Sequence, residues 1–199
     1  DDADLVAGID AASKNDFVTA YRLYVKAAER GIPVAQYRLG ILYYYGDGVR
    51  QDTEKALHWF RIAASNNVPG AMNFLGNMFS DGEGVAVDKA RSRQWYEVAA
   101  KFGDFHASSN LGLRYLYGDS GISQDYAKAF RHLRHASELG NTEAQHHLSY
   151  IYTEGKGVTK DYALAAFWAG FSAASAKPGG MLRLGILKRH GYGVEKDQA

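Results

Sequence analysis

Histidines are the residues of this sequence best suited to catalysis or metal binding. The seven are His58, His106, His132, His135, His146, His147 and His190. His132 and His135 are three residues apart, so in a helix they would share a face and could bind a zinc ion together. No carboxylate stands at the spacing of a third ligand, although one could come from elsewhere in the fold. We therefore expect surface and packing histidines, and neither a catalytic residue nor a metal ion.

Other catalytic signatures are missing. The Gly-x-Gly elements resemble phosphate loops only superficially, because they lack the Lys-Ser/Thr pair of a P-loop. The nucleophile-elbow, zinc-protease and calcium-loop patterns are absent as well. The chain has no cysteine, which excludes disulfides, thiol catalysis and cysteine-bound zinc. We expect no enzymatic activity and no cofactor.

The composition narrows the class of partner. The chain has 199 residues, 46% of them hydrophobic, which is typical of a folded globular protein. Lys and Arg number 23 against 22 Asp and Glu, so there is no basic excess of the kind that nucleic-acid binders show. No run of 18 apolar residues occurs, so no membrane span is predicted. The composition therefore points to neither a nucleic acid nor a membrane as the partner.

A pattern of 36 or 37 residues recurs along the chain. Its most visible part is a doublet that appears as Leu39-Gly40, Leu75-Gly76, Leu111-Gly112, Leu148-Ser149 and Leu184-Gly185. A glycine turn follows each doublet, and an Asp follows each turn, at Asp52, Asp88, Asp125, Asp161 and Asp197. The N-terminal segment is a divergent first copy. The predicted repeats are residues 1–34, 35–70, 71–106, 107–143, 144–179 and an incomplete 180–199.

Each repeat is predicted to form two helices, A and B. Ala35, Leu39 and Tyr43 share one face of the first helix A. The glycine turn ends this helix, and the Asp caps helix B. Glycine in mid-helix is unfavourable, so Gly40 suggests close approach of helix B, with Trp59 packed above it. About eleven helices and no sheet are expected.

The repeat resembles a known family. The pattern Ala-x3-Leu-Gly-x2-Tyr-x2-Gly-x-Gly-Val-x2-Asp-x2-Lys-Ala-x2-Trp-Tyr-x2-Ala-Ala is similar to the Sel1-like repeat, a relative of the tetratricopeptide repeat, here of the bacterial type without disulfides. The resemblance implies an all-α, right-handed α-solenoid of about six helix-turn-helix repeats, forming a single domain over residues 1–199. It also implies a concave groove lined by the A helices.

The groove residues can be predicted by counting places along helix A from its first small residue, so that Ala35 is place one. Places one, five, six and nine should be buried, and places three, seven and ten should face the groove. The predicted partner-binding residues are Tyr37, Ile41, Tyr44, Asn73, Asn77, Leu113, Leu116, His146 and Tyr150. Aromatic and apolar side chains are common at the centre of binding surfaces. The alternative is that some of them contact the neighbouring helix and belong to the core.

The resemblance also suggests a function. It implies a non-enzymatic protein–protein interaction module that holds a polypeptide in its groove, as an exported bacterial adaptor or regulatory protein. One alternative is a periplasmic immunity protein that neutralises a cognate secreted toxin such as a phospholipase effector. Another is binding of glycans or cell-wall fragments. The chain begins at Asp1 without Met, as a periplasmic or secreted protein would after removal of a signal peptide.

The last repeat suggests self-association. It stops before its helix B, and its helix A carries Leu182, Leu184, Ile186 and Leu187 on several sides. Exposed apolar surface of this kind favours contact with another protein. We therefore expect either a homodimer through the C-terminal repeat or, if the natural chain is longer, a tail beyond Ala199 that covers this surface.

Overall fold

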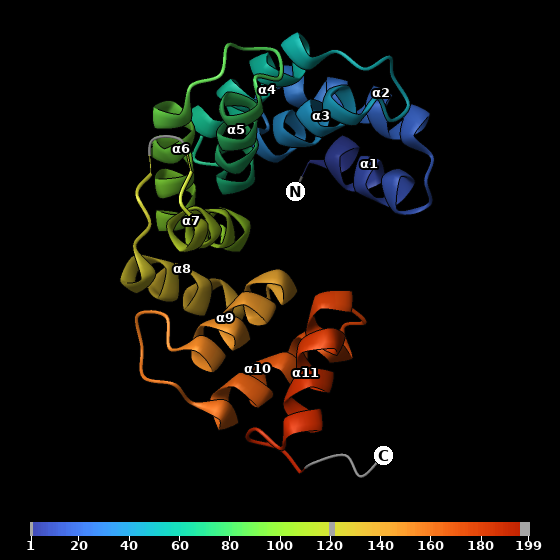
Figure 1. Ribbon diagram of the computed structural model, residues 1–199. Coiled ribbons are helices and arrows are strands. Elements are labelled where there is room, and N and C mark those ends of the chain that lie inside the picture. Colours follow the sequence, from blue (N-terminus) through green and yellow to red (C-terminus); the bar gives the residue numbers. More distant parts are fainter. Residues whose placement is uncertain (1, 120–121, 196–199) are drawn as a thin grey trace. The chain divides into compact units, whose positions relative to one another are not determined.

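The computed structural model describes residues 2–119 and 122–195, which form eleven α-helices (Figure 1). They are α1 (Ala3–Ser13), α2 (Phe17–Glu29), α3 (Pro33–Tyr45), α4 (Thr53–Ser65), α5 (Pro69–Asp81), α6 (Lys89–Lys101), α7 (Phe105–Tyr117), α8 (Tyr126–Glu138), α9 (Thr142–Glu154), α10 (Tyr162–Ala174) and α11 (Pro178–His190). The described part of the chain has no β-strand, only an isolated bridge between Asp119 and Ile122. The predicted all-α architecture is confirmed. Odd-numbered helices are the A helices and even-numbered ones the B helices.

The chain divides into two compact units, residues 1–104 and 105–199. The first contains α1 to α6 and the second α7 to α11. Within each unit, helices that follow one another in the sequence pack together. The expectation of a single domain over residues 1–199 stays a prediction.

The repeated Asp residues begin the B helices, as expected. The carboxylates of Asp16, Asp52, Asp88, Asp125 and Asp161 each accept a hydrogen bond from the backbone N–H three residues further on, at 2.9–3.1 Å. These bonds satisfy N–H groups that have no partner inside the helix. The bond from the Lys55 N–H holds the pKa of Asp52 below its usual value. Asp197, and Ser120 with Gly121 in the third turn, lie outside the described residues.

The glycine turns end the A helices. Gly46 has a φ of +81°, and its N–H donates to the Leu42 carbonyl at 2.8 Å. A residue with a side chain rarely adopts this left-handed conformation, which explains the glycine. The helix therefore stops at Tyr45 and the chain turns toward α4.

The mid-helix glycines admit a side chain from helix B, but not the one expected. Phe60 is fully buried against Gly40, whereas Trp59 is only half-buried, so the assignment to Trp59 was wrong. In the fifth repeat Ser149 replaces the glycine, and the residue equivalent to Phe60 is Ala169. The smaller alanine leaves room for the Ser149 hydroxyl, which donates to the Ala165 carbonyl at 2.7 Å.

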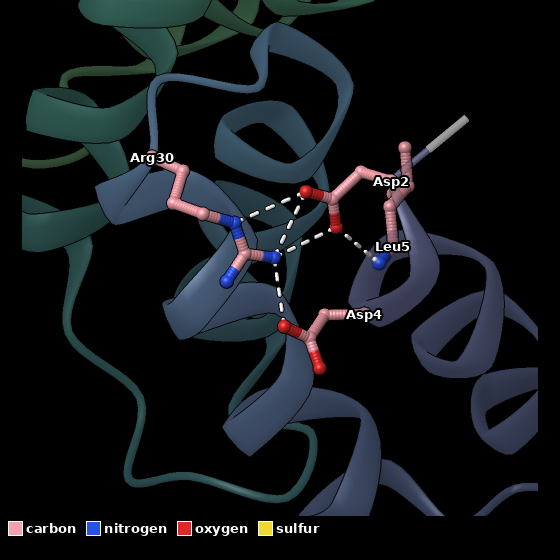
Figure 2. A network of polar contacts seen from close by, with 4 residues as sticks. All are labelled: Asp2, Asp4, Leu5 and Arg30. Atoms are coloured by element: carbon pink, nitrogen blue, oxygen red, sulfur yellow. Dashed lines mark hydrogen bonds and ion pairs between the residues drawn. The ribbon is translucent and has the colours of Figure 1, made fainter.

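A polar network ties the first two helices together (Figure 2). The Arg30 guanidinium, just after α2, lies 2.8 Å from Asp2 Oδ1 and 2.7 Å from Asp4 Oδ2. Asp2 also accepts from the Leu5 N–H at 3.0 Å and so caps α1. This hydrogen bond and Arg30 together lower the pKa of Asp2. The divergent first repeat is thus closed by an arginine that binds two carboxylates.

Candidate functional site

The predicted partner-binding residues fall in both compact units, and each unit is described separately. In the first unit, Tyr37 and Tyr44 of α3 lie at the junction with the next repeat. The Tyr37 ring centroid is 6.0 Å from that of Phe74, and the Tyr44 centroid is 5.3 Å from it. Phe60 of α4 stacks on Phe74 of α5 at 4.7 Å. These four rings form one aromatic cluster that joins α3, α4 and α5.

Burial in this cluster affects both tyrosines. It raises the pKa of the Tyr37 and Tyr44 hydroxyls, because a phenolate would lose its hydration there. The Tyr44 hydroxyl donates to the Glu83 carboxylate in the turn after α5. Much of the surface of both side chains is therefore buried in contacts between repeats.

The neighbouring residue, Tyr45, is the exposed aromatic of this region. Its side chain is 59% exposed, and its ring meets that of Tyr44 edge-on at 4.9 Å. Ile41 is half-buried on the same helix. Tyr45 was not among the predicted residues, yet it offers the largest aromatic surface on α3.

The two predicted asparagines of α5 are held inside the unit. Asn73 is buried. Asn77 is half-buried, and its Oδ1 accepts from the Tyr96 hydroxyl at 2.6 Å. The Asn77 amide therefore supports the packing of α5 on α6.

In the second unit, the predicted leucines of α7 differ from each other. Leu116 is 1% exposed and packs in the core. Leu113 is half-buried. Tyr117, at the end of the same helix, is 59% exposed and was not predicted. Its hydroxyl lies 3.1 Å from Nδ1 of His147.

His146 and Tyr150 of α9 are brought together with three residues outside the predicted partner-binding set, His147, Tyr117 and Arg183. His146 and His147 are in ring contact at 4.9 Å, and Tyr117 meets His147 edge-on at 5.8 Å. The Arg183 guanidinium of α11 lies over the Tyr150 ring at 5.2 Å. Burial, with His146 and Arg183 nearby, lowers the pKa of His147 to about 4. His147 is therefore neutral at physiological pH.

A pocket of about 390 Å³ opens beside His146. It is lined by Thr142, Glu143, His146, His147, Ser172, Lys177, Pro178, Gly179 and Gly180. The buried Nδ1 of His146 has no hydrogen-bond partner, and burial lowers the pKa of this histidine too. A neutral imidazole in such a setting can exchange hydrogen bonds with a polar group of a partner.

The two units share one orientation of helix A. Place eleven of helix A is exposed in α3, α5, α7 and α9, whereas places three, seven and ten are half-buried or buried in these helices. Place eleven is Tyr45 in α3 and Tyr117 in α7, and place four is Phe74 in α5 and His147 in α9. The recurrence of tyrosine at place eleven is a signal in the sequence that could have identified these residues.

The remaining expectations concern metals and membranes. His132 is partly buried and stacks on Tyr115 at 5.8 Å, and this burial lowers its pKa. Among the described residues, no three His, Asp or Glu side chains gather as a metal ion would require. No helix in residues 2–119 or 122–195 is long and apolar enough to cross a membrane.

The last helix is only partly as expected. Leu182 is 68% exposed and Ile186 is exposed as well. Leu187 is fully buried among Ala165, Ala166 and Ala169 of α10, so its predicted exposure was wrong. Helix α11 therefore has one face buried against α10 and another face that exposes apolar side chains to solvent.

Comparisons with known proteins agree with this architecture. The family model of the Sel1 repeat matches residues 7–32, 33–68, 69–104, 106–141, 142–175 and 178–199. A protective antigen of uropathogenic Escherichia coli with an SLR fold is 36% identical, with a TM-score of 0.86 over 98% of this chain and 42% of its own. A Sel1 repeat protein of Oxalobacter formigenes is 35% identical, with a TM-score of 0.84 over 91% of this chain and 74% of its own.

More distant relatives share the fold. An immunity protein of Pseudomonas aeruginosa is 26% identical, with a TM-score of 0.60 over 82% of this chain and 59% of its own. An uncharacterized protein of Neisseria meningitidis is 27% identical over 92% of this chain, which spans only 30% of that protein's length. The chain belongs to the Sel1 repeat family, whose stacked helix pairs form a protein-interaction scaffold.

Proposed function

We propose that this chain is a non-enzymatic interaction module that binds a partner polypeptide through the accessible faces of its A helices. The observation that carries the proposal is the exposed tyrosine at place eleven of α3 and of α7. Tyr45 and Tyr117 are each 59% exposed, yet each is held by neighbouring rings. A tyrosine fixed in this way loses little conformational freedom on binding and offers both an apolar ring and a hydroxyl.

The polar groups around each tyrosine suit a peptide backbone. In the second unit, the hydrogen-bonding capacity of His146 and the half-buried Tyr150 lie near Tyr117 and His147. In the first unit, Ile41 and Tyr44 flank Tyr45 on α3. In the second unit, an extended or helical peptide would place an apolar side chain on Tyr117 and a backbone group on the His146 imidazole.

The role of the complex and its location are part of the proposal. We favour an exported bacterial adaptor or regulatory protein that acts outside the cytoplasm. The fold shared with an immunity protein supports neutralisation of a cognate toxin as the second candidate. Glycan binding is the third, because exposed tyrosines such as Tyr45 can also stack on sugars.

A matched capture experiment tests the proposal. The wild-type chain and a Tyr45→Ala, Tyr117→Ala variant are used in parallel to capture proteins from a bacterial envelope extract, and the affinity of each purified partner is measured by calorimetry. We expect the variant to keep its Tm and to bind about 30-fold more weakly, since central interface residues contribute about 2 kcal/mol or more. Tyr44→Ala is the control, because it should lower Tm.

The outcomes separate the candidates. Equal binding by wild type and variant would show that the partner docks elsewhere. Saturable binding of cell-wall fragments, lost in the variant and without a protein partner, would favour glycan recognition.

A further inference from the structure

The outer face of α10 differs from that of the B helices before it. Where α10 has Leu164, helices α4, α6 and α8 have Lys55, Arg91 and Lys128. Phe167 and Phe171, on the same face, are 53% and 50% exposed. Helix α10 therefore presents apolar and aromatic surface to water, and at the place of Leu164 the three preceding B helices carry a charge.

A pocket of about 290 Å³ lies beside these rings. It is lined by Ser137, Glu138, Gly140, Gln145, Phe167, Trp168 and Phe171, which come from α8, the turn after it, α9 and α10. The Phe167 ring meets Trp168 at 5.2 Å and 84°, and Phe171 at 4.9 Å and 69°. The three rings thus form an angled aromatic wall.

Gln145 brings an unused hydrogen-bond acceptor to this pocket. The residue is 6% exposed, and its Nε2 donates to the Ser137 carbonyl at 3.4 Å. This bond fixes the orientation of the amide, since only the nitrogen can donate. The buried Oε1 has no hydrogen-bond partner. A buried acceptor without a partner is unfavourable and is rare in native proteins.

The second repeat shows how the same glutamine is normally satisfied. Gln36 occupies the equivalent place in α3, and its Nε2 donates to the Ala28 carbonyl at 3.4 Å. Its Oε1 accepts from the Asn66 side chain at 3.3 Å. The residue equivalent to Asn66 after α10 is Ser175, whose shorter hydroxyl instead donates to the Phe171 carbonyl at 3.4 Å. The fifth repeat therefore has the glutamine but lacks the side-chain N–H donor that satisfies it in the second repeat.

We propose that this pocket binds an arginine side chain of the partner polypeptide, with a guanidinium N–H donating to Gln145 Oε1 and the guanidinium plane lying on the aromatic wall. The inference rests on the proposed function, because it takes the ligand to be part of a polypeptide. It names a contact formed by α8, α9 and α10, apart from the tyrosines of α3 and α7.

Charge and shape both favour a guanidinium. Glu138 is the only ionisable side chain among the described residues that line the pocket, so the local charge is negative. Glu138 also accepts from Arg134 at 2.8 Å, but both side chains are half-exposed and solvent screens that pair. Arginine stacks on aromatic rings and donates several hydrogen bonds from one plane. Lysine carries its charge as a strongly hydrated ammonium and fits such a wall less well.

Fluorescence of Trp168 reports on the pocket directly. Trp59→Phe and Trp95→Phe leave Trp168 as the single tryptophan of the chain. Titration with N-acetyl-arginine methylamide should give a saturable change in its emission. The lysine and glutamine analogues should bind about 5–10-fold more weakly, because each lacks either the planar donor or the charge. No saturable response to the arginine probe, or an equal affinity for the glutamine probe, would overturn the proposal.

Three variants test the acceptor itself. Gln145→Leu should weaken the arginine probe about tenfold with little change in Tm, since the Ser137 carbonyl keeps the Gly140 N–H at 3.0 Å. Ser175→Asn should restore the donor found in the second repeat, raise Tm and reduce probe binding. Gln36→Leu is the matched control, which should lower Tm by about 3 °C and leave probe binding unchanged.

The results distinguish this inference from the proposed function. If the Gln145→Leu variant binds the arginine probe with wild-type affinity, the pocket does not recognise arginine. This conclusion holds whatever partner affinity the tyrosine variants show. If probe binding depends on Gln145 but partner binding is unchanged by substitution of Tyr45 and Tyr117, arginine recognition by the pocket is supported. The proposed binding through the A helices is then contradicted.

Discussion

The ring of Phe60 lies directly over Gly40. A Cβ atom added to Gly40 would stand 2.7 Å from Cδ1 and Cε1 of that ring, well inside van der Waals contact. Gly185 occupies the same place in α11, and a Cβ there would meet nothing within 4 Å. One position of the repeat therefore has two opposite surroundings.

Alanine at these two glycines should change stability in opposite directions. Gly40→Ala should lower the free energy of unfolding, because overpacking costs about 1–3 kcal/mol and exceeds the gain in helix propensity. Gly185→Ala should raise it by about 0.5–1 kcal/mol, since only the propensity gain applies. Urea denaturation followed by circular dichroism measures both. Stabilisation by both substitutions would show that close approach of Phe60 is not what requires Gly40.

The helices could be predicted from the sequence because their ends depend on local contacts. Asp52 caps α4 through the N–H of Lys55, only three residues away, and Gly46 ends α3 through a bond to Leu42. Whether Trp59 or Phe60 packs over Gly40 does not depend on such local contacts. Adjacent residues in a helix point about 100° apart. The angle at which α3 and α4 cross decides which one is buried, and no short-range pattern contains that angle.

The exposure of individual A-helix residues could not be predicted for the same reason. Tyr44 and Tyr45 are neighbours, yet Tyr44 packs in the cluster between repeats and Tyr45 is 59% exposed. Place ten was expected to face the partner, and Leu116 at that place is buried in α7. The sequence located the A helices, but the rotation of each one follows from its contacts with the next repeat.

Loss of an Asp cap should have a moderate cost. Asp52→Ala should lower the free energy of unfolding by about 1 kcal/mol, because the Lys55 N–H loses the acceptor at 2.9 Å. Asp52→Asn should keep most of the stability, since asparagine caps helices well. Lys55→Met is the control for the exposed ion pair between Lys55 Nζ and Asp52 Oδ2 at 3.3 Å. It should change the free energy of unfolding little. Hydrogen exchange of α4 checks the local effect, and equal protection in the alanine variant would contradict it.

The open face of α11 should drive self-association. Leu182 and Ile186 are exposed, and covering large apolar side chains is worth about 1.5–3 kcal/mol each. We expect a concentration-dependent dimer in light scattering, and a monomer for Leu182→Gln, Ile186→Gln with an unchanged Tm. Leu187→Gln should instead unfold the end of the chain, because Leu187 is fully buried. A wild-type chain that stays monomeric at high concentration would contradict the predicted dimer.

Stability should fall as the pH is lowered through the range set by His147. Its pKa is about 4 in the folded protein and 6.5 in an ordinary environment, because burial beside His146 and Arg183 disfavours the imidazolium. Between these values the unfolded chain binds a proton that the folded chain does not. The unfolded state is therefore favoured progressively as pH falls from 6.5 to about 4.

Replacing His147 tests this origin. His147→Gln removes the titrating group and keeps a side chain that can bond the Tyr117 hydroxyl, which lies 3.1 Å from Nδ1 in the wild type. The fall in Tm between pH 6.5 and 4.5 should become smaller, although not vanish, since burial also lowers the pKa of His146 and His132. His58→Gln, on the exposed side of α4, is the matched control. If both variants show the wild-type dependence of Tm on pH, protonation of His147 does not destabilise the second unit in acid.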